Sequence, residues 1–259
     1  MALPSKENTE YIQKVFQRFV EESGHKRFIN FSDNEPLILA LKESVTQRLK
    51  GCDAIPRSCP VGDHAANGVI EVGVRELKRQ MRAIRFSLES KLGSSIPNDH
   101  AILAWLPSFA AQAINIFRAD ASGKTPYERE FGRKWNRPAL EFGELVYIRE
   151  AEERTGKKDW KERLTKVRFV GHHSRTNAVL GLAADGLHVG SAVKRLSEDD
   201  GWSRDGLEEI GALPWDLKST ASHDAGTRLV EKAEKRVRLP PPPPETPDAR
   251  AFYDPEGHQ

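Results

Sequence analysis

The stretch Asn67-Gly68-Val69-Ile70-Glu71 opens the segment that decides the fold. From about residue 65 to residue 91, apolar residues recur at steps of four and three, which is the spacing of one face of an α-helix. The apolar positions are Ile70, Val74, Leu77, Met81, Ile84 and Leu88. No proline interrupts them, so the sequence predicts one long helix that packs against a core. The same spacing would also suit a coiled-coil seam, the less favoured interpretation.

The neighbouring face of this helix combines one carboxylate with a ladder of cations. Glu71 lies near the helix start, and the cations that follow it are Arg75, Lys78, Arg79, Arg82 and Arg85. Upstream, the apolar run at residues 28–32 ends in Asp33. A strand-end aspartate and a helix glutamate can share a divalent metal, and cations beside them can hold a phosphate backbone. The alternative is a solvated charged face.

The composition fits one large domain or two small ones. The chain has 259 residues, 38% of them apolar, and a formal net charge of +2 that does not by itself indicate a nucleic-acid binder. The cations are segregated, however, since residues 72–91 hold six Lys and Arg against two Glu. Neither a membrane-spanning apolar run nor a signal-peptide pattern is present. Cys52 and Cys59 are the only cysteines, which is typical of a reducing, intracellular location.

The first half of the chain has the pattern of an α/β layer. We expect helices at residues 5–23, 36–50 and 99–117 in addition to the long helix, with strands at 27–32 and 52–55 and a loop at 56–63. In the helix at 99–117 the residues expected to face the core are Trp105, Phe109, Ala113 and Phe117. Two short strands make a small sheet, so we expect an unpaired edge, a partly uncovered apolar face and a marginal core.

The second half reads as all-β. Residues 121–142 are a predicted connector, and residues 143–217 a small β-barrel with a tail, at Trp202 and Trp215, that packs back on it. The predicted strands cover residues 145–148, 165–170, 178–183 and 187–193. Residues 218–259 are predicted to be disordered. Their proline run at residues 240–244 is a spacer or, less often, a ligand for an SH3 or WW domain.

Three other groups of residues offer weaker signals. Cys52, Cys59 and His64 lack a fourth zinc ligand, and the pair His172-His173 lies in a predicted turn. Cations in the barrel segment alternate with acidic residues, which favours a mixed solvated surface over a binding patch. They are Lys157, Lys158, Lys161, Lys166 and Arg168.

Taken together, these motifs resemble the catalytic core of copia-type retrotransposon integrases, an RNase H-like family whose triad is Asp, Asp, Glu. The second Asp of that family ends a strand and precedes Asn, as in Asp33-Asn34, and Asn-Gly-x-x-Glu follows on a helix, as in residues 67–71. Here 37 residues separate Asp33 from Glu71. The Thr125-Pro126-Tyr127-Glu128 element and the following barrel, similar to the SH3-like domain after such cores, extend the resemblance over about residues 5–200.

The resemblance implies a partial RNase H-like core at residues 1–120 and DNA integration by metal-dependent strand transfer. Asp33 and Glu71 would be catalytic and would hold Mg²⁺ or Mn²⁺. The residues implied to contact DNA are Asn67, Arg75, Lys78, Arg79 and Arg82. The family's first strands and first Asp are absent, so we expect an N-terminally truncated, catalytically incomplete fragment, nuclear if functional. Its partners would be DNA, a second copy, or a chain supplying the missing strands, with no membrane. The alternatives are a non-catalytic nucleic-acid-binding or oligomerising module, or a decayed gene.

Overall fold

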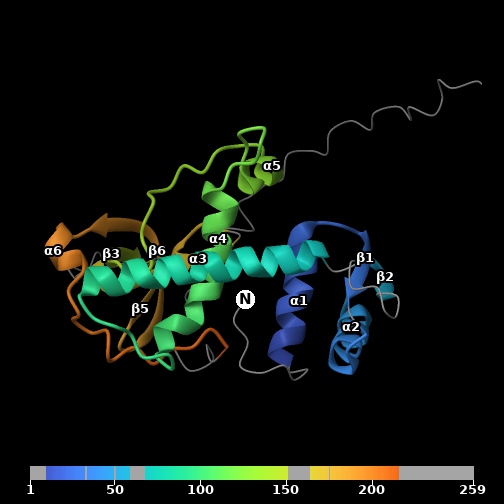
Figure 1. The fold of residues 1–259 in the computed structure, drawn as a ribbon, viewed down its shortest axis with the longest axis horizontal. Coiled ribbons are helices and arrows are strands. Elements are labelled where there is room, and N and C mark those ends of the chain that lie inside the picture. The colour runs from blue at the N-terminus through green and yellow to red at the C-terminus, as the bar shows by residue number, and fades with distance from the viewer. Residues whose placement is uncertain are drawn as a thin grey trace, which may run out of the picture.

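The structure is a computed structural model, and it describes residues 10–32, 34–49, 51–58, 68–150, 164–174 and 176–215. Helix α3 (Gly68–Leu92) crosses the molecule, with the β-barrel toward its C-terminal end and the smaller elements of the first part of the chain toward its N-terminal end (Figure 1). Those elements are α1 (Glu10–Ser23), β1 (Arg27–Ser32), α2 (Pro36–Arg48) and β2 (Asp53–Ser58). In the described ranges, no helix combines the length and apolar character needed to cross a membrane.

After α3, helices and strands come in separate groups. The 3₁₀ helix η2 and helices α4 and α5 come first, four strands follow, and a short helix α6 comes last. Their bounds are η2 Ala101–Trp105, α4 Leu106–Phe117, α5 Pro126–Phe131, β3 Leu145–Glu150, β4 Leu164–His172, β5 Val179–Ala183, β6 Gly186–Arg195 and α6 Glu198–Gly201. The predicted mixture of helix and sheet is confirmed, while its RNase H-like and SH3-like character stays a prediction.

Strands β1 and β2 form a two-stranded parallel sheet. One face packs toward α1 and α2 through a small cluster made of Val20, Val45 and Leu49, with Phe28 against it. On the other face Ile29 lies opposite Ile55, and these side chains are 55% and 38% exposed. Parallel sheets are normally covered on both faces. Within the described residues this sheet therefore has the uncovered apolar face that the sequence predicted.

Strands β3 to β6 close into an antiparallel barrel in which each strand pairs with two neighbours. Its interior is filled by Leu140, Val146, Ile148, Val167, Phe169 and Val179. A Cβ atom on Gly181 would lie 2.2 Å from Cγ2 of Val167, so only glycine lets these strands approach. The closed sheet has no free edge, which confirms the small barrel predicted from the alternating strands.

The largest core joins the second half of α3 to α4 and the barrel. Its buried residues are Leu88, Leu92, Ile96, Ile102, Trp105, Leu106, Phe142, Val170, Leu182, Leu187, Leu207 and Ile210. Trp202 packs against this cluster, and the indole N–H of Trp105 donates to the carbonyl of Ala212 over 2.9 Å. The chain after β6 thus packs back as predicted. The core takes residues from both sides of the connector predicted at 121–142.

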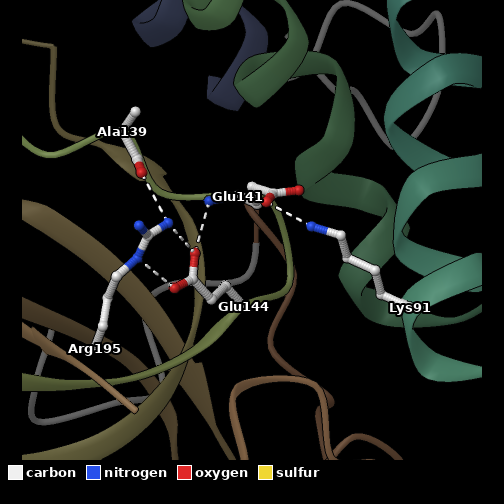
Figure 2. Close-up of polar contacts among 5 residues, drawn as sticks. All are labelled: Lys91, Ala139, Glu141, Glu144 and Arg195. Atoms are coloured by element: carbon white, nitrogen blue, oxygen red, sulfur yellow. Dashed lines mark hydrogen bonds and ion pairs between the residues drawn. The ribbon is translucent and has the colours of Figure 1, made fainter. Parts of the chain in front are cut away.

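A polar clamp holds the end of α3 beside the barrel (Figure 2). The guanidinium of Arg195 on β6 donates to both carboxylate oxygens of Glu144, over 2.6 and 2.9 Å, and to the carbonyl of Ala139. Glu144 also accepts from the backbone N–H of Glu141, whose own carboxylate pairs with Lys91 near the end of α3. Because Glu144 is buried, this chain of contacts fixes the segment before β3 against the last turn of α3.

Some local predictions were wrong. Residues 56–58 continue β2 instead of belonging to a loop. Residues 126–131 form a short helix, because Thr125 and Glu128 make a capping box at its start. The helix predicted at 99–117 begins as a 3₁₀ turn, and its last residue, Phe117, is 57% exposed instead of facing the core. Phe117 is the last residue of α4 and lies beyond the part of the helix that contacts the core, so it is exposed although it continues the apolar stripe.

Candidate nucleic-acid interface

A groove of about 580 Å³ lies between the end of β1, the start of α2 and the first turns of α3. Its lining comprises Phe31, Ser32, Ile38, Ile70, Glu71, Val74, Arg75, Lys78 and Arg82. Segments distant in the sequence therefore meet at this groove, since the end of β1 and the start of α2 lie beside α3. Asp33 and Asn67 themselves lie outside the described residues.

Three of the predicted DNA-contacting residues line this groove together with Glu71. Arg75, Lys78 and Arg82 are spaced by three and four residues, which places them on one face of α3. All three are exposed, and within the ranges that the structure describes none of them forms an ion pair. Three guanidinium and ammonium groups beside one groove, without an ion-pair partner among the described residues, can bind successive anionic groups of a ligand.

Arg79, also predicted to contact DNA, has a different position. It does not line the groove, and its guanidinium forms an exposed ion pair with Glu76 at 3.2 Å. Glu76 also pairs with Arg118, which follows α4, at 2.8 Å. Exposed pairs of this kind contribute little to stability, so Arg79 stays able to exchange its carboxylate for another anion.

Arg85, the last cation of the ladder, serves the fold. Its guanidinium donates to Glu89 over 3.0 Å, to the side chain of Asn98 over 2.7 Å and to the carbonyl of Ile96 over 2.7 Å. Glu89 in turn accepts from the N–H of Ile96, and this bond, together with that from Arg85, lowers the pKa of the Glu89 carboxyl. Arg85 therefore ties the turn after α3 to the helix and is not available to a ligand.

Sequence reasoning missed Lys42, whose ammonium lies at the carboxyl ends of β1 and β2. Its side chain is 5% exposed, and its ammonium donates to Ser32 Oγ over 3.0 Å and to the carbonyl of Arg57 over 2.9 Å. It therefore ties together the carboxyl ends of β1 and β2. A lysine within an apolar helix stripe, four residues after Ile38 and three before Val45, is the signal that could have indicated it.

Apolar side chains form the rest of the groove lining. Ile70 and Val74 are 54% and 44% exposed, although they begin the stripe that the sequence assigned to a core-facing helix side. The second half of the stripe is covered, with Leu88 1% exposed. The prediction of core packing is thus correct for the C-terminal half of α3 and wrong for its first turns in the described part of the chain.

The predicted metal ligands are only partly described. Glu71 is the one carboxylate among the described groove residues, and nowhere in the described ranges do three or more His, Cys, Asp or Glu side chains gather as metal ligands would. Mg²⁺ needs further oxygen ligands beside one carboxylate. We therefore derive no metal-dependent step, and the implied Mg²⁺ or Mn²⁺ stays a prediction that depends on Asp33.

Among the weaker candidates, those that the structure describes gather into no metal site. Cys52 is a free cysteine whose thiol lies 3.8 Å from the carbonyl of His25, while Cys59 and His64 fall outside the described residues. His172 packs edge-on against Trp135 and Phe169. Burial, and secondarily the charge of Arg137, lowers its pKa to about 4, so its ring is neutral near pH 7.

The buried Arg168 of β4 belongs to the barrel fold and not to a binding patch. Its side chain is 1% exposed, and its guanidinium donates to the carbonyls of Gly143, Ser203 and Asp205 over 3.1, 2.6 and 2.8 Å. Burial is the main cause that lowers its pKa to about 10, so it stays charged at neutral pH. Of the other barrel-segment cations, Lys157, Lys158 and Lys161 lie outside the described residues.

Two comparisons with known proteins identify no family for this chain. No protein-family model matches the chain, and no curated protein matches it.

Proposed function

We propose that the chain binds nucleic acid through the groove beside α3, as a retrotransposon-derived integrase fragment. The observation that carries the proposal is the convergence of Arg75, Lys78 and Arg82, all without ion pairs among the described residues, on one groove. Cations in such a row neutralise phosphates and release counterions, which gives sequence-independent binding that weakens with salt.

The position of Glu71 supports the integrase origin. Its carboxylate lines the same groove as Ser32, the residue before Asp33, so the acidic and basic motifs of the resemblance share one region. The family role is DNA integration, in which a metal-activated 3′-hydroxyl attacks a phosphodiester. We therefore propose binding of DNA at this groove as the activity to test first.

The test is the salt dependence of binding to a short DNA duplex, measured by fluorescence anisotropy. Arg75→Gln combined with Lys78→Gln removes two groove cations, and the slope of log K against log salt should fall in magnitude by about 1.8. The matched control is Arg133→Gln with Lys134→Gln, two exposed cations after α5 that do not line the groove. An unchanged slope in the groove variant, or an equal change in the control, would contradict the proposal.

An oligomerising module is the second candidate, and it rests on a separate observation. Ile29, Ile55 and Leu37 are 55%, 38% and 46% exposed around the small sheet. A second copy, or a chain that supplies further strands, would cover them. Sedimentation velocity distinguishes the two candidates. A monomer that binds DNA supports the first, whereas a dimer disrupted by Ile29→Lys, with DNA affinity unchanged, supports the second.

A further inference from the structure

Phe86 is the most exposed phenylalanine of the described chain. It lies on α3, and 75% of its side chain is accessible. The other exposed large apolar residues of α3 belong to its first two turns and end at Val74. Phe86 is twelve residues further on, about 18 Å along the helix axis, so it is not part of that apolar surface.

The surroundings of Phe86 on the helix are cationic. Arg82, Arg79 and Arg75 precede it by four, seven and eleven residues, which places all three within about 40° of Phe86 around the helix axis. The nearby carboxylate of Glu89 is held by Arg85 and by the N–H of Ile96. We call the surface formed by Arg75, Arg79, Arg82 and Phe86 the Phe86 face.

This arrangement matches the chemistry of a single-stranded nucleic acid. Such ligands bind grooves and surfaces where cations follow the backbone and aromatic rings stack on unpaired bases. One ring is enough for one base, whereas a protein partner would need a contiguous apolar patch, and a single exposed apolar residue does not make one. In a closed duplex the bases are stacked on one another and offer no free face to the ring.

We propose that the Phe86 face binds single-stranded nucleic acid, with the Phe86 ring stacked on a base and the arginines on the backbone. The inference rests on the proposed function, since the same helix would hold the phosphates. It adds single strands to the expected ligands, because stacking on Phe86 requires an unpaired base. That base would lie near the C-terminal end of α3, which is the end toward the barrel (Figure 1).

The experiment compares two short single strands with the same number of phosphates, one an oligothymidylate and the other composed of abasic residues. Anisotropy at one fixed salt concentration gives the affinity of the full chain for each strand, and for a duplex. The chain should prefer the base-bearing strand by about 5- to 150-fold, the range expected for one stacked base. Phe86→Ala should abolish this preference and leave duplex affinity unchanged, while Phe86→Tyr should keep the preference. Phe19→Ala, at a phenylalanine 67% exposed on α1, is the matched control.

The outcomes separate this inference from the proposed function. If the chain binds neither strand nor duplex, the proposed function is wrong and this inference fails with it. If it binds the abasic and base-bearing strands equally, or if Phe86→Ala keeps the preference, only the stacking role is wrong. A change of sedimentation coefficient in Phe86→Ala, without a change in base preference, would show that the ring packs against protein and would overturn the inference.

Discussion

The two halves of the apolar stripe on α3 should differ sharply in their contribution to stability. Leu88 is 1% exposed within the core that joins α3 to the barrel, whereas Ile70 is 54% exposed beside the groove. The two residues occupy equivalent positions in the helical repeat, so the sequence alone assigns them the same role. Replacing each with alanine tests whether the groove is open.

The magnitudes follow from burial. Leu88→Ala removes a fully buried side chain from a close-packed cluster, for which the transfer and cavity costs sum to about 3–4 kcal/mol. Ile70→Ala removes a side chain whose surface is about half in water, which costs about 1 kcal/mol. Alanine also favours a helix more than isoleucine does, by up to about 0.5 kcal/mol. The net loss for Ile70→Ala is therefore about 0.5–1 kcal/mol.

Equilibrium unfolding in guanidinium, followed by tryptophan fluorescence, measures both changes. Trp105 and Trp202 contact the core that contains Leu88, so their emission reports its loss. A loss above about 2 kcal/mol for Ile70→Ala would mean that the first turns of α3 are covered, which would refute the open groove. A loss below about 1 kcal/mol for Leu88→Ala would refute the core assignment.

Two further predictions concern the barrel. Gly143→Ala should cost about 2–4 kcal/mol of unfolding free energy, because φ is +78° and the new Cβ would lie 2.6 Å from Cδ1 of Leu88; Gly206→Ala, at φ +66° with no atom within 4 Å of the new Cβ, should cost only about 1–2 kcal/mol. His172 should make stability fall as pH drops, because its folded pKa of about 4 lies below the ordinary 6.5 and the unfolded chain therefore binds the proton first. Allowing for partial exposure, about 1–2 kcal/mol should be lost between pH 7 and pH 4.5, and His172→Gln should remove this slope; an equal slope in the variant would assign it to other groups.

The elements that the sequence predicted best are those whose signal is local. The apolar repeat of α3 and the alternation of β3 to β6 report which face of an element is apolar, and both recur over several residues. The signal for α5 was local as well, but it resides in the hydrogen bonds of Thr125 and Glu128, which an apolar repeat does not reveal.

What the sequence could not predict is the partner of each face. The apolar stripe of α3 does not show that only its residues from Met81 onward are covered, because the covering residues come from α4 and the barrel. The cation ladder likewise looks uniform, yet Arg85 is bound by Asn98 and Ile96 after the helix, and Glu76 beside Arg79 is shared with Arg118. These pairings depend on tertiary contacts, which cannot be predicted from the spacing of residues along one helix.

The division of α3 also explains how a groove with little packing of its own could present charges in fixed positions. Helix extension adds one hydrogen bond for each residue that it orders, so a half that is held in a core stabilises the half that is not. From Leu88, which anchors the helix, to Glu71 is 17 residues, or about 26 Å of continuous helix. The barrel core therefore positions Arg75, Lys78 and Arg82 indirectly, through the stiffness of α3. Apolar contacts around those cations are then not needed for their alignment, which leaves the groove lining free to bind a ligand.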